Sequence, residues 1–190
     1  MRKPLLLALL LLPGLAPAEV LNYDYVYLSR NGTESDGHGT AGGYKSFGRH
    51  THVFLSADDT AFYAGSHDNW TYDLKTWRAG AGGHYMIGKR TMIAPALSVF
   101  HSEGTVLAPS WLAPRRLNGN GTIAEVDLRH AMSDRIELVA AARRTQFQGD
   151  RWSELVGGVM FHATPKWAVG ALYHRREQAN ATEFTVRYYY

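Results

Sequence analysis

Apolar and polar side chains alternate with a period of two residues along most of the chain beyond residue 20. In the run 124–129, Ala, Val and Leu occupy the even positions, whereas Glu, Asp and Arg occupy the odd ones. The run 184–190 places aromatic or β-branched residues at every even position in the same way. A period of two sends successive side chains to opposite faces of a strand. The pattern therefore predicts an all-β protein.

Ten segments carry this alternation. They are 20–30, 38–47, 52–63, 74–86, 91–103, 120–132, 135–147, 153–163, 167–177 and 182–190. The joints near 48–49, 88–90, 133–134 and 164–166 are short, and those at 31–37, 64–73, 104–119, 148–152 and 178–181 are mostly longer and polar. Short turns at one end and longer loops at the other are typical of a transmembrane antiparallel up-and-down β-barrel, whose tilted strands need ~9–11 residues. Ten strands are expected, or eight if two weak segments are not strands.

The composition of the two faces favours a membrane barrel over a soluble sandwich or a lipocalin-like barrel. One face is Leu, Val, Ile, Ala, Tyr and Trp over several strands, and the other combines Arg, Glu, Asp, His and Gly. In the first strand Leu21, Tyr23, Tyr25 and Tyr27 share one face, and Asp24 is assigned to the inward face. Aromatic residues gather at strand ends, where membrane girdles lie: Tyr23, Trp77, Tyr85, Trp152, Trp167, Tyr188 and Tyr190.

The first 18 residues have the pattern of a secretory signal peptide. Arg2 and Lys3 precede eight consecutive apolar residues, and a small-x-small site ends at Ala18. Cleavage there leaves 19–190 as the barrel domain and reduces the 20 Lys and Arg to 18, against 17 Asp and Glu. A nearly balanced charge gives no argument for nucleic-acid binding. The chain has no Cys, which excludes thiol chemistry and Cys-ligated metals. We expect export to the outer membrane of a Gram-negative cell.

The C-terminus supports the same destination. Phe184, Val186, Tyr188 and the terminal Tyr190 share one face of the last strand. This looks like the closing-strand signature of bacterial outer-membrane proteins, which the barrel-assembly machinery reads. We therefore expect that machinery to be a partner during biogenesis.

Several short Gly-rich motifs resemble a known family. They are Trp77-Arg78-Ala79-Gly80-Ala81-Gly82, Ile93-Ala94-Pro95-Ala96-Leu97, the segment from Gly121 to Leu138, and Leu21-Asn22-Tyr23-Asp24-Tyr25-Val26. Together they resemble the small outer-membrane barrels of plant-associated and opportunistic proteobacteria that are linked to quorum sensing. The resemblance implies an outer-membrane barrel without an established enzymatic activity. The Trp- and Pro-bearing segment 104–119 departs from that pattern, so no signalling role is inferred.

Charged residues assigned to the inward face form the main candidate site. They are Arg78, Glu125, Asp127, Arg129, Glu137, Arg143, Glu154 and Arg187. A barrel of about eight strands is just wide enough for side chains to fill, whereas water-filled channels need ~16–18 strands. We therefore expect ion pairs to cross-link the lumen and the protein to have a structural or surface-interaction role. The alternative is a narrow general porin, because small inward residues (Gly80, Gly82, Ser98, Gly158 and Gly170) leave room for a path.

Enzymatic alternatives rest on rim residues. Asp58-Asp59 with His67-Asp68 resembles the rim site of omptin proteases, and His101-Ser102-Glu103 superficially resembles a lipid A hydrolase. Adjacent strand residues point to opposite faces, so neither set forms a site without a bulge. The spacing His50-x-His52 falls at a turn and predicts no metal site. We expect no enzyme, cofactor or metal.

The segment 104–119 is the candidate for an external contact. It is apolar and Pro-containing, and it continues into Arg115-Arg116. Guanidinium groups form paired hydrogen bonds with phosphate oxygens. We therefore expect the outer-membrane lipid and lipopolysaccharide to be partners, with Arg115 and Arg116 contacting lipopolysaccharide. The same segment could instead fold over the barrel mouth.

Overall fold

The computed structural model describes residues 21–31, 39–64, 70–107, 115–176 and 180–190. These residues form eleven strands: β1 Tyr25–Asn31, β2 Gly39–Phe47, β3 Thr51–Ala64, β4 Trp70–Gly83, β5 Tyr85–Ile87, β6 Thr91–Leu107, β7 Arg115–Ala131, β8 Ile136–Phe147, β9 Asp150–His162, β10 Trp167–Arg176 and β11 Asn180–Tyr189. The three-residue β5 follows β4 after a break at His84 and pairs with the first residues of β6. Among the described residues, no helix is long and apolar enough to cross a membrane.

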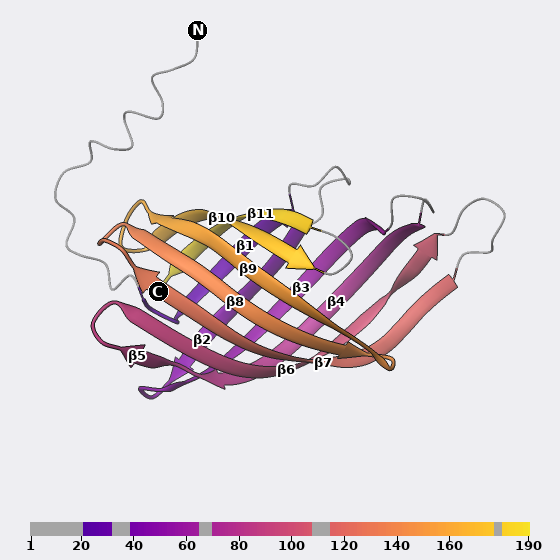
Figure 1. Cartoon of the computed structure of the whole chain (residues 1–190), viewed down its shortest axis with the longest axis horizontal. Coiled ribbons are helices and arrows are strands. Elements are labelled where there is room, and N and C mark those ends of the chain that lie inside the picture. Colours follow the sequence, from indigo (N-terminus) through magenta and orange to yellow (C-terminus); the bar gives the residue numbers. More distant parts are fainter. Residues whose placement is uncertain (1–20, 32–38, 65–69, 108–114, 177–179) are drawn as a thin grey trace, which may run out of the picture.

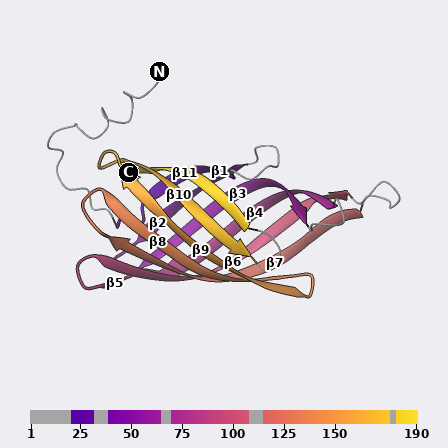
Figure 2. The ribbon, with the colours of Figure 1, turned by 45° about the horizontal axis from the view of Figure 1, so that its top comes forward.

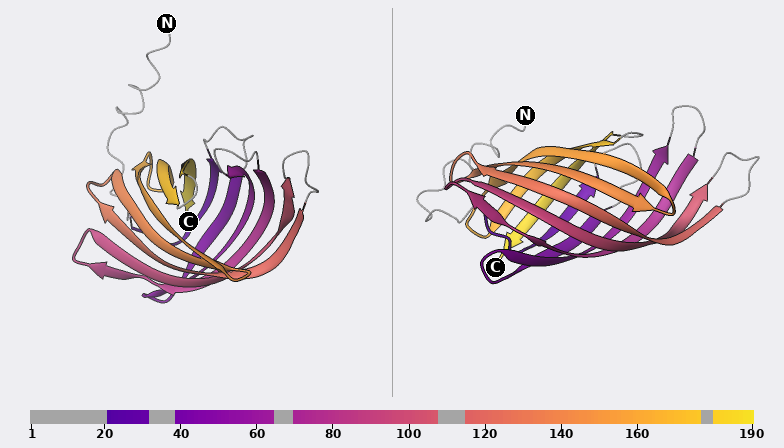
Figure 3. Two further views of the ribbon diagram at one scale, coloured as in Figure 1. Left: turned by 45° about the vertical axis from the view of Figure 1, so that its right-hand side comes forward. Right: turned by 60° about the horizontal axis from the view of Figure 1, so that its bottom comes forward.

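The sheet closes on itself. Consecutive strands pair antiparallel, except that β4 pairs with β6 and not with β5, and β1 pairs with β11 from Tyr25–Tyr189 to Asn31–Glu183. The described strands thus make a ring of ten, with β5 as an appendage (Figure 1). The strands curve around a common axis (Figure 3). Closure pairs the backbone groups of both edge strands, which a lipid environment requires. The ten-stranded prediction is confirmed, and the eight-stranded alternative is wrong.

The two ends of the barrel differ in their connections. At the end that we call the turn end, residues 48–50, 88–90, 132–135 and 163–166 join the strands, and the chain enters β1 and leaves β11. Gly48 and Gly88 have φ values of 67° and 71° there, a backbone conformation that favours glycine. At the opposite end, the loop end, the β8–β9 connection is only Gln148 and Gly149, with φ values of 50° and 96°. The longer loop predicted at 148–152 is therefore wrong, because pairing resumes at Asp150.

The predicted loop 104–119 is also mostly strand. β6 and β7 each have 17 residues, and their register continues through Gly104–Leu117 to Val106–Arg115. Two antiparallel strands that are already paired extend at the cost of little further ordering, and Thr and Val at 105–106 favour the extended backbone. β4, β6 and β7 therefore reach farther at the loop end than the remaining strands (Figure 2).

The outer face is apolar and the inner face is polar and buried. Leu97 and Leu28 are 70% and 66% exposed, whereas Glu137 is completely buried. This distribution is the reverse of that in a soluble barrel and matches a barrel whose outer face contacts lipid. The outward residues Trp77, Tyr85, Trp167 and Tyr190 are exposed aromatics of the expected girdles.

The predicted facing of the first strand is wrong. Tyr25 is buried and Tyr27 is half-buried, while Val26 and Leu28 are exposed on the outer face. Both faces of β1 are apolar, so the period of two does not tell them apart. The space for the Tyr27 ring comes from the neighbouring strand, where the ring lies against Gly42.

Three further inward or girdle assignments change. Tyr23, expected in a girdle, is buried among aromatic rings inside the barrel. Trp152 is half-buried and pairs in register with the buried Thr145. Asp24, expected inward, makes its contacts with β2 at the turn end instead: it accepts hydrogen bonds from the Ser46 backbone N–H (2.5 Å) and the Lys45 Nζ (3.0 Å).

Candidate functional site

The lumen holds the candidate site. All eight predicted network residues, Arg78, Glu125, Asp127, Arg129, Glu137, Arg143, Glu154 and Arg187, are buried or half-buried at inward positions of their strands. The alternation of the strands places them there. Residues separated by an even number of positions lie on the same face of a strand, and residues paired in register lie on the same face of the sheet. The structure divides them between two clusters.

The first cluster, here called the central cluster, starts at Glu125 of β7. Its Oε1 accepts a hydrogen bond from Arg78 of β4 at 2.6 Å, and its Oε2 accepts one from Arg143 of β8 at 3.0 Å. The carboxylate side chain is 1% exposed. Both of its oxygens are thus paired with guanidinium groups, which compensates for the loss of hydration.

The central cluster continues through Glu154 of β9. Its carboxylate lies 3.4 Å from Arg143, 2.7 Å from Arg176 and 2.9 Å from the Nδ1 of His174. The Nε2 of His174 lies 3.0 Å from Glu183 of β11. A continuous chain of contacts therefore links β4, β7, β8, β9, β10 and β11 around the inner wall.

The second cluster lies closer to the turn end and is called the turn-end cluster. Glu137 of β8 accepts a hydrogen bond from the Nη2 of Arg129 at 2.9 Å, and the Nε2 of His162 lies 3.0 Å from the same carboxylate oxygen. The Nη1 of Arg187 lies 3.7 Å from the other oxygen. Arg129 also donates to the hydroxyl of Tyr189 at 3.3 Å.

The turn-end cluster crosses the full width of the lumen. In the ring of ten strands, β1 and β7 are five places apart in either direction, so they face each other. Arg129 of β7 donates to the backbone carbonyl of Asn22, just before β1, at 2.8 Å, and its guanidinium lies over the ring of Tyr25, 5.8 Å from the centroid. The hydroxyl of Tyr23 donates to the Oδ2 of Asp127 at 3.4 Å. Opposite walls of the barrel are therefore in direct contact.

Aromatic side chains occupy the space over the inward glycines. A Cβ added to Gly80 would collide with the ring of Phe54, and one added to Gly121 would collide with the ring of Phe100. Gly42 lies under Tyr27 in the same way. A large side chain on one strand thus fills the space left by a glycine on its neighbour, as in aromatic rescue of strand glycines.

Side chains of neighbouring strands cover the inward glycines on which the narrow-porin alternative depends. Gly82 lies against His52, Gly158 against Leu172, and Gly170 against the Sδ of Met160. Ser98 is 5% exposed and accepts a hydrogen bond from the Nε of Arg78 at 2.7 Å. On a single strand, a small inward residue suggests empty volume in the lumen. In the barrel, a side chain of the neighbouring strand fills that volume.

Titratable groups outside the membrane-spanning strands gather at the turn end. Partial burial would raise the pKa of Asp24, but the Ser46 N–H and the Lys45 ammonium outweigh it and lower that pKa. Burial, with the neighbouring His50, lowers the pKa of His84. The His84 ring stacks on Tyr23 with 5.3 Å between centroids, so the aromatic packing extends to this end of the lumen.

The described residues of the enzymatic alternatives do not converge on one site. Asp58 faces inward, where it accepts a hydrogen bond from Thr40 at 2.5 Å, whereas Asp59 is exposed on the outer face. His67 and Asp68 lie outside the described residues. Ser102 is buried inside and hydrogen-bonds to Thr76 at 2.7 Å, while the adjacent His101 pairs with Asn120 at 2.8 Å.

No metal centre is formed by the part of the chain that the structure describes, which contains no group of three His, Asp or Glu that could hold an ion. His50 lies in a turn with its ring stacked on Tyr85, and His52 points into the lumen. The two histidines of the His50-x-His52 spacing therefore belong to different environments.

The remaining predicted residues lie on the outer surface or outside the description. Arg115 and Arg116 are the first residues of β7, rather than the end of a loop, and Arg116 is exposed. Phe184, Val186 and Tyr190 are exposed on the outer side, and Tyr188 packs against Trp167 with 4.9 Å between ring centroids. The signal-peptide segment 1–18 lies outside the described residues.

The tyrosines of β1 are the site residues that the sequence pattern missed. Tyr25 and Tyr27 form part of the lumen, with the Arg187 guanidinium 4.9 Å from the Tyr25 ring centroid. The sequence did contain a signal: Val26 and Leu28 form a second apolar face of β1, and their aliphatic side chains suit contact with acyl chains better than the tyrosines do. Gly42, opposite Tyr27 in register, marks the inward side.

Neither a protein-family model nor a curated protein matches the sequence. Among solved structures, the KdgM porin in complex with disordered oligogalacturonate has a TM-score of 0.55 and 9% identity, covering 87% of this chain and 99% of that chain. The NanC porin has a TM-score of 0.51 and 7% identity, covering 88% and 100%. These likenesses show the fold of a small outer-membrane β-barrel. They do not confirm the quorum-sensing-linked family.

Proposed function

We propose that the protein is an outer-membrane barrel with a closed lumen and a structural or surface-interaction role. The observation that carries this proposal is the contact of Arg129 with the chain entering β1 on the opposite wall, through the Asn22 carbonyl and the Tyr25 ring. A conducting path along the axis would have to separate these groups. The apolar outer face supports placement in a membrane.

The charge pattern of the central cluster supports the same function. Three carboxylates, Glu125, Glu154 and Glu183, face three guanidinium groups and one imidazole of the same cluster. Each of these carboxylates is within 3.0 Å of a basic group of the protein. Charges paired in this way stabilise one another and offer little attraction to a passing ion.

The alternative is a narrow porin. The KdgM and NanC porins share the fold, and the oligogalacturonate named with KdgM is an acidic oligosaccharide. For this chain such a role rests on the likeness of fold alone. The contacts across the lumen and the rings over Gly80 and Gly121 oppose it.

Planar-bilayer conductance tests the proposal. Refolded mature protein is compared with a general porin in the same bilayers and with the variant Tyr25→Ala/Arg129→Ser. We expect no stepwise current from the natural sequence and leak currents from the variant, because the variant loses the side-chain contacts between β1 and β7. Regular current steps from the natural sequence, of the same size in every insertion, would establish a pore and overturn the proposal.

A further inference from the structure

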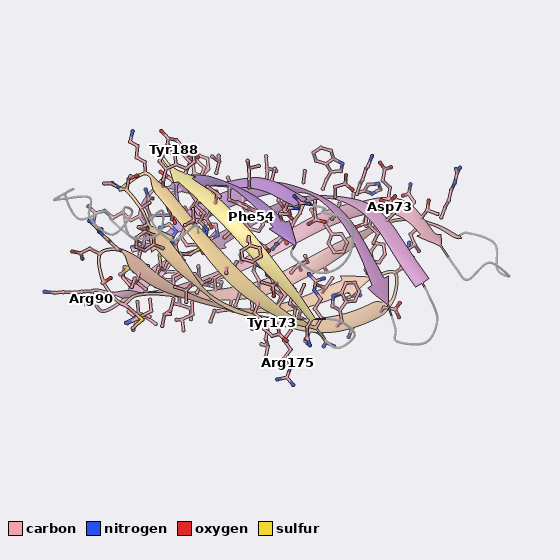
Figure 4. The ribbon with its side chains drawn as sticks, turned by 90° about the horizontal axis from the view of Figure 1, so that it is seen from above. Phe54, Asp73, Arg90, Tyr173, Arg175 and Tyr188 are labelled. Carbon is pink, nitrogen blue, oxygen red and sulfur yellow. The ribbon has the colours of Figure 1, made fainter. Side chains whose placement is uncertain are left out.

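The outer surface at the loop end carries a one-sided cluster of arginines. Arg144 of β8, Arg151 of β9 and Arg175 of β10 are all exposed on the outer face. Figure 4 shows Arg175 projecting away from the barrel beside Tyr173. We refer to these three residues as the arginine patch.

The register places the three guanidinium groups around one point. Arg144 pairs with Ser153 and donates to its Oγ at 2.8 Å, while Arg151 is two residues from Ser153 on β9. Arg175 pairs with Leu155, the other residue two positions from Ser153. Arg144 and Arg151 are diagonal neighbours, ~7–8 Å apart. Arg175 is the diagonal neighbour of Ser153 from the other side, so the three long side chains surround Ser153.

The arginine patch lies where the apolar outer face ends. Ala142 and Tyr173 are the last apolar outward residues of β8 and β10, and Arg144 and Arg175 are the next outward residues toward the loop end. On β9, Leu155 is followed by Ser153 and then Arg151. In a membrane barrel this level is the boundary between acyl chains and headgroups.

Among the described residues, no acidic side chain pairs in register with the arginine patch. Its outward neighbours in register are Ala124, Gln146, Ser153, Leu155 and Asn180, all uncharged. Within the part of the chain that the structure describes, neither Arg151 nor Arg175 forms an ion pair. The outward acids Asp59 and Glu103 lie on other strands, and both pair in register with Lys75 of β4.

Resting on the proposed membrane location, we propose that the arginine patch binds the phosphates of lipid A, the lipid anchor of lipopolysaccharide. Guanidinium groups form paired hydrogen bonds with phosphate oxygens, and the apolar residues next to the patch receive the acyl chains of the same molecule. This moves the expected lipopolysaccharide contact from Arg115 and Arg116 to β8–β10. It gives the surface-interaction role a ligand.

Native mass spectrometry of the refolded mature protein tests this assignment. The probes are lipid A with two phosphates and the same lipid after removal of both phosphates. The test variant is Arg144→Gln/Arg151→Gln/Arg175→Gln, and the control is Lys89→Gln/Arg90→Gln/Lys166→Gln, which removes the same charge from exposed residues at the turn end. Figure 4 shows Arg90 at the end opposite Asp73.

We expect the natural sequence and the control to retain phosphorylated lipid A ~10-fold or more over the dephosphorylated lipid, and the test variant to lose that preference. Equal retention of both lipids by the natural sequence, or an undiminished preference in the test variant, would overturn the assignment. Folding is followed in the same samples by heat-dependent gel migration. A folded protein without lipid A preference leaves the closed barrel intact, whereas failure to insert into lipid contradicts the proposed function itself.

Discussion

At the scale of single residues, the lumen is filled by pairs in which a large side chain on one strand lies over a glycine on the next. The ring of Phe54 on β3 lies over Gly80 on β4, the strand with which it pairs in register. The guanidinium of Arg78 lies 4.7 Å from the centroid of the same ring. A glycine here is a packing requirement, because any Cβ would take the volume that the ring occupies.

Gly80→Val is therefore expected to destabilise the barrel by ~1–3 kcal/mol, the usual cost of overpacking. Combining it with Phe54→Ala should recover part of the loss, because the truncated side chain vacates that volume. The control is Gly157→Val on the outer face, where an added Cβ meets nothing within 4 Å. The measurement is urea unfolding in liposomes. Equal destabilisation by the two valines would contradict the packing described for Gly80.

The sequence predicted the inward charges well and the inward aromatics poorly. Glu125 and Glu137 alternate with apolar residues, so the period of two assigns their face directly. Tyr25 alternates with Val26, and both are apolar, so only the three-dimensional pairing with Gly42 and its neighbours decides the face. The long-range partners, such as Arg129 with the chain before β1, depend on barrel closure and carry no local signal.

At the scale of elements, β8–β11 each present about four consecutive outward apolar positions before polar residues begin. On β8 these are Ile136, Leu138, Ala140 and Ala142, and Arg144 follows. The strand segments and short turns were predictable because alternation and turn residues are local. The far ends of β6 and β7 were not, since pairing between strands extended them into a stretch whose Pro and Gly content is typical of a loop.

Leu138→Arg is expected to lower the free energy of unfolding by ~2–4 kcal/mol, because it places a cation within the lipid-facing band. Gln146→Arg, on the same face of β8 but beyond Arg144, should change it little. Both are measured by urea titration of the liposome-inserted protein. If the two substitutions cost the same, the outer face of β8 does not contact lipid as described.

At the scale of the whole molecule, the structure combines an apolar exterior with an interior of paired charges and stacked rings. The all-β class and the ring of ten strands follow from features that the sequence shows. The contacts that carry the proposed closed lumen do not, because they join residues on opposite walls of the barrel. In such a barrel, each residue is surrounded by lipid, by water or by packed protein.

Three consecutive alanines of β8 allow these surroundings to be measured directly. Ala140 and Ala142 face outward and Ala141 is buried inside, and the chain has no Cys, so each can be changed singly to a spin-labelled cysteine. In liposomes, labels at 140 and 142 should collide often with oxygen and rarely with a water-soluble nickel chelate, whereas a label at 141 should collide rarely with either. Frequent nickel collisions at 141 in the folded protein would reveal a water-filled pore and contradict the closed barrel.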